Sequence, residues 1–259
     1  MSENYSLIKD EEETKRFIKK VLQPLTNDEV YIVVLTARKK YCSTISSSME
    51  VVTRDIIRNN DTNKILRKLK KMSIVEGLYT DKNDDIIPNE AFALYILPEP
   101  RSMLKAYNEF TKNINEWNYE NLVKSNVVEG ANLELYRKLD LKLFSAIHKS
   151  RSKSNYFIID IDKKDETLLN NVLDQIKMGV LSKDLGTSLQ WKHPSMELIS
   201  WISETRGGWH IILNRNNESG KIVHEIMKRK FEFIEFRKET MTPIVGSSQG
   251  GFVVKEYRL

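Results

Sequence analysis

Two aspartates separated by one residue are the strongest chemical signal in this sequence. Asp160 and Asp162 lie at the end of the apolar run 156–161, and carboxylates at positions i and i+2 of a strand share one face. Two carboxylates that are withdrawn from water repel each other and need a counter-charge. Their oxygens suit Mg²⁺ or Mn²⁺, which in a two-metal arrangement binds the phosphates of a nucleotide and activates an attacking hydroxyl. The alternative is an ordinary strand end, with Asp165 as the N-cap of the next helix.

A second signal places a guanidinium, two glycines and an imidazole within five residues. Arg206 suits bidentate phosphate binding, and Gly207 and Gly208 would let backbone N–H groups approach an anion. The alternative is a tight hairpin turn built on the Gly-Gly pair, with His210 as a hydrogen-bonded histidine of the sheet. The glycine-rich stretch 246–251 is equally compatible with a phosphate-facing loop and with a flexible connection.

The spacing of apolar residues predicts the elements that position these groups. Strand character alternates with helical spacing in the order βαββαβ, an RRM-like α+β arrangement with two helices on one face of an antiparallel sheet. In this arrangement the first and third strands are central neighbours. The predicted strands are 156–161, 198–202, 209–213 and 252–257, and the predicted helices are 167–178 and 219–231.

Alternation with a period of two predicts the face that each strand residue occupies. On the first strand, Tyr156 and Ile158 share the face of the two aspartates, while Phe157, Ile159 and Ile161 pack on the helices. On the third strand, Trp209, Ile211 and Leu213 pack inward, which leaves His210, Ile212 and Asn214 outward. The sequence therefore predicts that two aspartates and one histidine meet on an open sheet face.

These motifs, in this order, resemble motifs one and two of the archaeo-eukaryotic primase (AEP) superfamily, which includes small primase-polymerases of phages and mobile elements. The first is the apolar strand ending in Asp160-x-Asp162, and the second is Arg206-Gly207-Gly208-Trp209-His210. The resemblance covers residues 150–259. It implies an RRM-like catalytic core, catalytic divalent metal on the aspartates, and His210 as a ligand of the phosphates of the incoming nucleotide, with Arg206 nearby.

The family's third motif supplies a further acidic residue on a late strand. In the segment 252–256 only Glu256 offers a carboxylate, so it is the candidate third metal ligand. Lys255, on the alternate face, is a candidate phosphate ligand. If Glu256 does not reach the aspartates, the site has two carboxylates instead of three, which favours a binding protein over a polymerase.

The first half is predicted to be a mainly helical α/β module over residues 1–150, followed by the catalytic module over 151–259. It has two expected strands, 31–35 and 91–97, and two apolar helical stripes, 101–117 and 133–147. After the first strand, three cations and an aromatic ring could hold the backbone of a template or primer, and a solvated basic turn is the alternative. These residues are Arg38, Lys39, Lys40 and Tyr41.

Composition restricts the class of protein. The 259 residues suffice for one large domain or two small ones, and the net charge of +5 fits a nucleic-acid partner without demanding one. Cys42 is the single cysteine, so an intramolecular disulfide and a cysteine-based zinc cage are excluded. No apolar run approaches the roughly 18 residues of a membrane span, and the first residues are polar and acidic. We therefore expect a cytoplasmic protein.

Together these patterns predict a DNA primase-polymerase-like nucleotidyltransferase acting in DNA replication or repair. It would use Mg²⁺ or Mn²⁺ and nucleoside triphosphates on a single-stranded or primed DNA template, with a separate helicase or replication initiator as a candidate partner. Two alternatives stay open. One is a non-catalytic protein that binds single-stranded nucleic acid on the same kind of sheet, and the other is a metal-dependent phosphodiesterase that uses the same acids.

Overall fold

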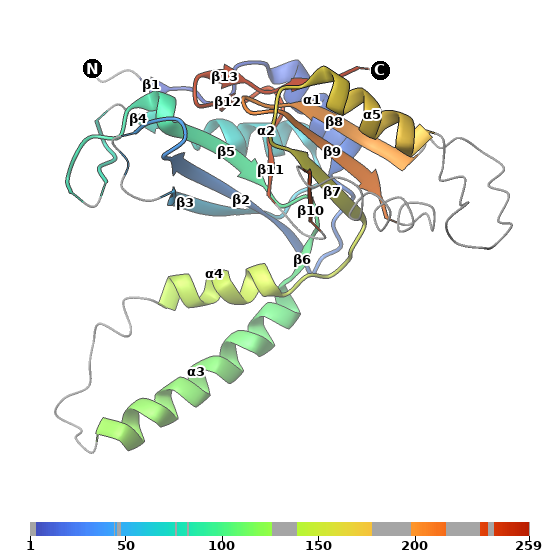
Figure 1. Ribbon diagram of the computed structural model, residues 1–259. Coiled ribbons are helices and arrows are strands. Elements are labelled where there is room, and N and C mark those ends of the chain that lie inside the picture. Colours follow the sequence, from blue (N-terminus) through green and yellow to red (C-terminus); the bar gives the residue numbers. More distant parts are fainter. Residues whose placement is uncertain are drawn as a thin grey trace, which may run out of the picture.

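The chain is an α+β protein built on antiparallel sheets, seen in the computed structural model of Figure 1. The structure describes residues 4–43, 45, 48–75, 77–81, 83–125, 139–177, 198–215, 234–237 and 241–258. The larger sheet has seven strands and contains the path β13-β12-β5-β2-β3, with β11 paired to β5 and β6 paired to β2. Its strands are β2 (Glu29–Arg38), β3 (Met49–Ile57), β5 (Phe92–Ile96), β6 (Arg101–Ser102), β11 (Thr242–Pro243), β12 (Ser248–Gln249) and β13 (Phe252–Val253).

The smaller sheet has five strands in the order β10-β7-β9-β8-β14, and every neighbouring pair is antiparallel. Its strands are β7 (Tyr156–Ile161), β8 (Ile199–Glu204), β9 (Trp209–Asn214), β10 (Ile234–Arg237) and β14 (Lys255–Glu256). A two-stranded ribbon pairs β1 (Asn4–Tyr5) with β4 (Ile74–Val75), and a short 3₁₀ helix spans Asn89–Ala91.

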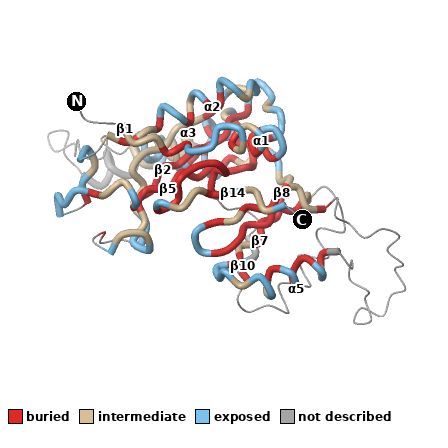
Figure 2. Tube along the Cα trace, turned by 90° about the horizontal axis from the view of Figure 1, so that it is seen from above, coloured by how far each residue is buried: buried red, intermediate tan, exposed pale blue. Residues whose placement is uncertain are grey.

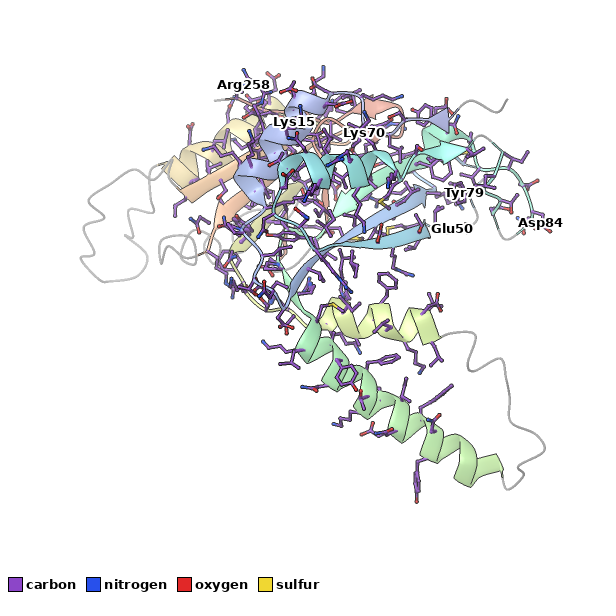
Figure 3. The ribbon with its side chains drawn as sticks, turned by 180° about the vertical axis from the view of Figure 1, so that it is seen from behind. Lys15, Glu50, Lys70, Tyr79, Asp84 and Arg258 are labelled. Atoms are coloured by element: carbon purple, nitrogen blue, oxygen red, sulfur yellow. The ribbon has the colours of Figure 1, made fainter. Side chains whose placement is uncertain are left out.

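Helices α1 (Glu11–Val21) and α2 (Thr62–Lys70) begin at aspartate N-caps. The Asp10 carboxylate accepts the Glu13 N–H, and the Asp61 carboxylate accepts the Lys64 N–H, each at 2.9 Å, which satisfies a backbone donor that has no partner inside the helix. Figure 3 labels Lys15 and Lys70 on these two helices, and Lys70 binds Glu11 at 2.6 Å. The opposite faces of both helices are apolar and buried.

The main core gathers side chains from both sheets and from α1 and α2. In Figure 2 the buried strands lie between the partly exposed helices α1 and α2 on one side and α5 (Glu166–Lys177) on the other. Helix α5 covers the second face of the smaller sheet, where Leu169, Val172 and Leu173 pack against Phe157, Ile159 and Ile161. This packing confirms the predicted inward set of the first strand of that sheet.

Helices α3 (Met103–Ser125) and α4 (Leu139–Lys149) form an arm that projects from the body (Figures 1 and 3). At its base, Ala106 and Ile147 pack against Val30, Ile32 and Val34 of β2. None of the helices in the described part of the chain is both long and apolar enough to cross a membrane.

The final strand differs from its prediction. The segment predicted as one strand over 252–257 is divided between the two sheets, because Val254 is buried in the main core and donates its N–H to the Ser247 carbonyl at 2.9 Å. Its second part, β14, pairs with β8. The strand beside β7 is instead β10, which follows the predicted helix 219–231, a segment outside the described residues.

The first half contains more sheet than its apolar stripes predict. The expected strand 31–35 is confirmed as part of β2, and the expected strand 91–97 contains β5. The helical stripe 101–117 overlaps α3, and the stripe 133–147 overlaps α4 from residue 139 on, its first six residues lying outside the described part of the chain. Strand β3 was not predicted because polar residues interrupt it and most of its side chains are only partly buried. Strands β11 and β12 pair with β5 across the boundary placed at residue 150, so that boundary does not separate the two sheets.

Candidate metal and phosphate site

Strands β7 and β9 bring the first and second motifs together, as period-two alternation predicts. Asp160 is the register partner of His210, and Oδ1 of Asp160 lies 2.9 Å from Nε2 of His210. The register is maintained by the opposite face, where Ile159, Ile161 and Trp209 pack beneath α5. His210 is buried, and its Nδ1 has no hydrogen-bond partner among the described residues.

These two residues belong to a polar row that crosses the smaller sheet. Register pairing aligns one residue from each strand, in the order Glu235, Asp160, His210, Ser203 and Glu256. Directly paired residues of antiparallel strands point to the same face. The row therefore presents three carboxylates on one face, two at one end and one at the other.

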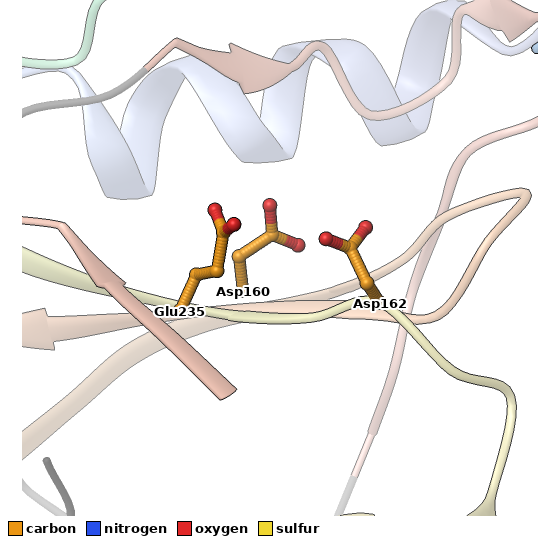
Figure 4. Close-up of side chains that lie close together, drawn as sticks. All are labelled: Asp160, Asp162 and Glu235. Atoms are coloured by element: carbon orange, nitrogen blue, oxygen red, sulfur yellow. The ribbon is translucent and has the colours of Figure 1, made fainter. Parts of the chain in front are cut away.

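The end of the row at β10 forms an acidic cluster. Asp160, Asp162 and Glu235 each offer a carboxylate oxygen, and these oxygens lie within 4.8 Å of one another. Figure 4 shows the three side chains pointing to the same side of the sheet. Glu235 was absent from the sequence prediction, although the alternation of the stretch 231–237 is the pattern of a half-buried strand.

Glu256 lies at the other end of the row. Three strand spacings separate it from Asp160, which corresponds to about 14 Å. Its carboxylate contacts Arg16 of α1 at 3.5 Å and Arg258 at 3.1 Å. The structure therefore does not bring Glu256 to the aspartates, and Glu235 occupies the place of a third carboxylate.

The face expected to be open is partly covered. Tyr156 and Ile158 pack into the main core, and the Trp201 ring meets the Phe17 ring of α1 edge to face at 5.7 Å. The row is exposed at its two ends, where the side chains of Asp160 and Glu256 are 17% and 22% exposed. The carboxylates thus lie at the border between a packed core and solvent.

The larger sheet contributes a group of cations and phenols. Arg38 Nη1 donates to the Tyr95 hydroxyl at 2.9 Å, and Gln249 Nε2 donates to the same oxygen at 3.1 Å. Burial opposes the charge of Arg38, but the Tyr95 and Tyr41 phenols and the Asp160 carboxylate outweigh burial and raise the pKa of its guanidinium. Arg38 and Asp160, far apart in sequence, therefore interact electrostatically. Tyr95 and Gln249 carried no sequence signal for this role.

The turn at 205–208 is built around close packing. Gly208 accepts the Thr205 N–H at 2.8 Å and donates its own N–H to Thr205 Oγ1 at 3.1 Å. A Cβ atom at Gly208 would lie 1.7 Å from the carbonyl oxygen of Ile161. Position 208 therefore requires a glycine, because the backbone approaches β7 too closely for a side chain. The Gly208 N–H is bonded to Thr205 and does not face an anion. Gly207 has room, with Lys40 Nζ 3.9 Å from the place of its Cβ.

The glycine-rich stretch 246–251 belongs to the larger sheet. It contains β12, and the Gly250 N–H donates to the Phe92 carbonyl at 3.0 Å. Arg206 joins the turn to this stretch, because its Nη1 donates to the Gly250 carbonyl at 2.7 Å and its N–H donates to Gln249 Oε1 at 2.9 Å. Neither a free phosphate loop nor a flexible connection describes this packing.

The remaining predicted residues lie outside this cluster or at its rim. Lys255 is exposed and pairs with Glu204, whose partner Trp209 faces α5, so Lys255 lies on the opposite face from the acids. Lys39 and Lys40 are exposed on the turn after β2. The structure thus assembles Asp160, Asp162, His210, Arg38 and Arg206, with Tyr41 among them, and leaves Lys255 and Glu256 apart.

A scan against protein-family models finds no match for this chain, and searches of curated proteins and of solved structures find none either.

Proposed function

We propose that this chain is a metal-dependent nucleotidyltransferase of the primase-polymerase kind, related to the AEP superfamily. The observation that carries the proposal is the acidic cluster of Asp160, Asp162 and Glu235, joined to His210 through Asp160 and facing the cation of Arg38. The strand order β10-β7-β9-β8 reads 4-1-3-2 in chain order. That order supports an RRM-like core whose second helix is expected at 219–231.

The acidic cluster fits a divalent cation in number, spacing and type of donor. Three carboxylate oxygens within 4.8 Å can share one ion, and oxygen ligands of this kind suit Mg²⁺ and Mn²⁺. Asp160, Asp162 and Glu235 would hold the metal. When bound, such an ion stabilises charge on phosphate oxygens and lowers the pKa of a coordinated hydroxyl.

The proposed reaction uses this arrangement. A 3′-hydroxyl loses its proton to solvent and attacks the α-phosphorus of a nucleoside triphosphate, so that a new phosphodiester bond forms and the bond to the leaving pyrophosphate breaks. His210 positions the Asp160 carboxylate through its Nε2, and Arg206 lies at the turn beside it. Single-stranded or primed DNA is the proposed template, held in part by the basic segment 38–41.

The geometry favours this reaction over a non-catalytic binding protein. A site with only two carboxylates would favour a binding protein. Glu235 pairs with Asp160 in register and supplies one.

The test is extension of a primed single-stranded template with labelled nucleotides in Mg²⁺ or Mn²⁺. The wild type is compared with the double variant Asp160→Asn/Asp162→Asn. The matched control is Asp174→Asn, an exposed acid on α5 outside the acidic cluster. We expect product from the wild type and the control, and none from the double variant.

Two other outcomes contradict the proposal. Salt-dependent binding of DNA without product, equal in all three proteins, would identify a binding protein. Shortening of the labelled strand in place of extension, lost in the double variant, would identify a phosphodiesterase.

A further inference from the structure

Three cations surround one aromatic ring at the seam between the two sheets. The Tyr41 ring centroid lies 5.9 Å from Cζ of Arg38, 5.6 Å from Nζ of Lys40 and 5.0 Å from Cζ of Arg206. Arg38 ends β2 of the larger sheet, whereas Arg206 lies in the turn between β8 and β9 of the smaller sheet. Residues about 165 positions apart in the chain therefore converge on a single side chain.

Within the described part of the chain, no carboxylate lies within 4.0 Å of any of these three cations. Some other basic residues are paired with a carboxylate, since Lys68 contacts Asp55 at 2.9 Å, Lys70 contacts Glu11 at 2.6 Å and Arg151 contacts Glu99 at 3.1 Å. Like charges that are gathered around one ring repel one another. The π-face of Tyr41 offsets only part of this repulsion.

The protein holds two of the three cations, Arg38 and Arg206, in place by packing and hydrogen bonds, whereas Lys40 is exposed. Arg38 is bonded to Tyr95, and Arg206 is bonded to the Gly250 carbonyl. A Cβ atom at Gly250 would lie 2.4 Å from Arg206 Nη1 and 2.5 Å from Cγ of Tyr41, so the ring and the guanidinium are packed against this glycine. Burial raises the pKa of the Tyr41 phenol, which keeps it neutral. The tyrosine therefore supplies no anion of its own.

The turn that carries Arg206 packs against the strand of the two aspartates, because a Cβ atom at Gly208 would lie 1.7 Å from the carbonyl oxygen of Ile161. The Asp160 carboxylate also contributes to the raised pKa of Arg38. A compact ligand with several negative charges matches three cations around one point better than a nucleic-acid strand, which spreads one charge over each nucleotide. We propose that Arg38, Lys40 and Arg206 bind the β- and γ-phosphates of the nucleoside triphosphate substrate. This inference rests on the proposed function, and it transfers Arg38 and Lys40 from the template to the nucleotide.

The test measures binding of inorganic tripolyphosphate and of dATP by calorimetry, in EDTA so that no divalent metal contributes. The variants are Lys40→Ala and Arg206→Ala, because both side chains are exposed and their truncation leaves the core intact. The matched control is Lys112→Ala, an exposed lysine on the arm helix α3. Thermal unfolding of each variant confirms that it is folded.

We expect each site variant to raise the Kd for both ligands about tenfold, as the loss of one charged hydrogen bond implies. Lys112→Ala should leave both values unchanged. Affinity for a single-stranded oligonucleotide should stay at the wild-type value in all variants. Arg206→Lys, which keeps the charge, should recover part of the tripolyphosphate affinity.

Three results would overturn the inference. The first is a wild type that does not bind tripolyphosphate, and the second is equal weakening in Lys112→Ala. The third is loss of oligonucleotide binding with tripolyphosphate binding intact, which would assign these cations to a template strand. The proposed function is judged separately: Asp160→Asn/Asp162→Asn should lose extension and should bind tripolyphosphate without metal at least as tightly as the wild type, because two nearby negative charges are removed.

Discussion

Nε2 of His210 lies 2.9 Å from Oδ1 of Asp160, directly across the β7–β9 pair, and both side chains are largely buried. The contact requires a proton on Nε2 and fixes the orientation of the carboxylate in the acidic cluster.

Replacement of His210 by leucine should lower nucleotide incorporation by about 10- to 100-fold, the usual effect of removing a group that orients a metal-binding carboxylate. His210→Gln keeps an N–H donor and should retain more activity than His210→Leu. Steady-state incorporation rates at saturating Mn²⁺ measure this. Equal loss in both variants would show that the hydrogen bond to Asp160 is not the reason for the histidine.

Glu235 and Glu256 occupy opposite ends of one polar row and provide a matched pair of variants. Glu235→Gln should weaken Mn²⁺ binding about tenfold or more, because it removes a carboxylate from the acidic cluster. Glu256→Gln should not change Mn²⁺ affinity, because its carboxylate contacts Arg16 and Arg258. Titration of Mn²⁺ followed by electron paramagnetic resonance distinguishes the two. The opposite order of effects would return Glu256 to the metal site.

The two glycines of the 205–208 turn should tolerate substitution very differently. Gly208→Ala places a methyl group 1.7 Å from the Ile161 carbonyl oxygen, so we expect the free energy of unfolding to fall by about 3 kcal/mol or more. Gly207→Ala meets nothing closer than 3.9 Å and should be nearly neutral. Urea unfolding of both variants measures the difference. A stable Gly208→Ala protein would contradict this packing.

The ionisation of Glu99 should make the stability of the folded protein depend on pH. It is 3% exposed, and burial raises the pKa of its carboxyl above the usual 4.5 even though Arg151 contacts it at 3.1 Å. The folded state then binds this proton more tightly than the unfolded state. The contribution to stability is therefore fully present below pH 4.5 and is lost as the pH rises through the folded-state pKa.

Glu99→Gln cannot titrate at this position, so it provides the reference. We expect the free energy of unfolding of the wild type, minus that of Glu99→Gln, to decrease steadily between pH 4 and pH 7. Urea unfolding of both proteins at each pH gives this difference, in which the other titrating groups largely cancel. A difference that increases with pH would mean that Arg151 outweighs burial.

Local periodicity predicted the parts of the site that lie on single strands. It placed Asp160 and His210 on one face and Ile159, Ile161 and Trp209 on the other, because the side-chain period of a strand is a property of the backbone. The function, the metal and the nucleotide remain predictions from the resemblance and the geometry.

The features of the site that the sequence did not predict depend on contacts between segments that lie far apart in the chain. Glu235 was missed because nothing in a short segment specifies which strand pairs with β7. The predicted open face is partly covered by α1, which comes from the other end of the chain. For Gly208, the sequence left access for an anion and a tight hairpin turn both open, and its close approach to the Ile161 carbonyl explains the glycine. Such contacts depend on tertiary structure and leave little trace in local patterns.

The pairing of β5 with residues near the end of the sequence has a consequence for synthesis on the ribosome. The outer edge of β5 is filled by β11 and β12 and by the N–H groups of Ile244 and Gly250. Until residues 242–250 have been translated, that edge is an unpaired apolar strand, which can pair with other chains. The nascent chain should therefore depend on protection of this edge, and the contacts of Tyr41 with Arg206 and Gly250 can form only after residue 250 has been translated.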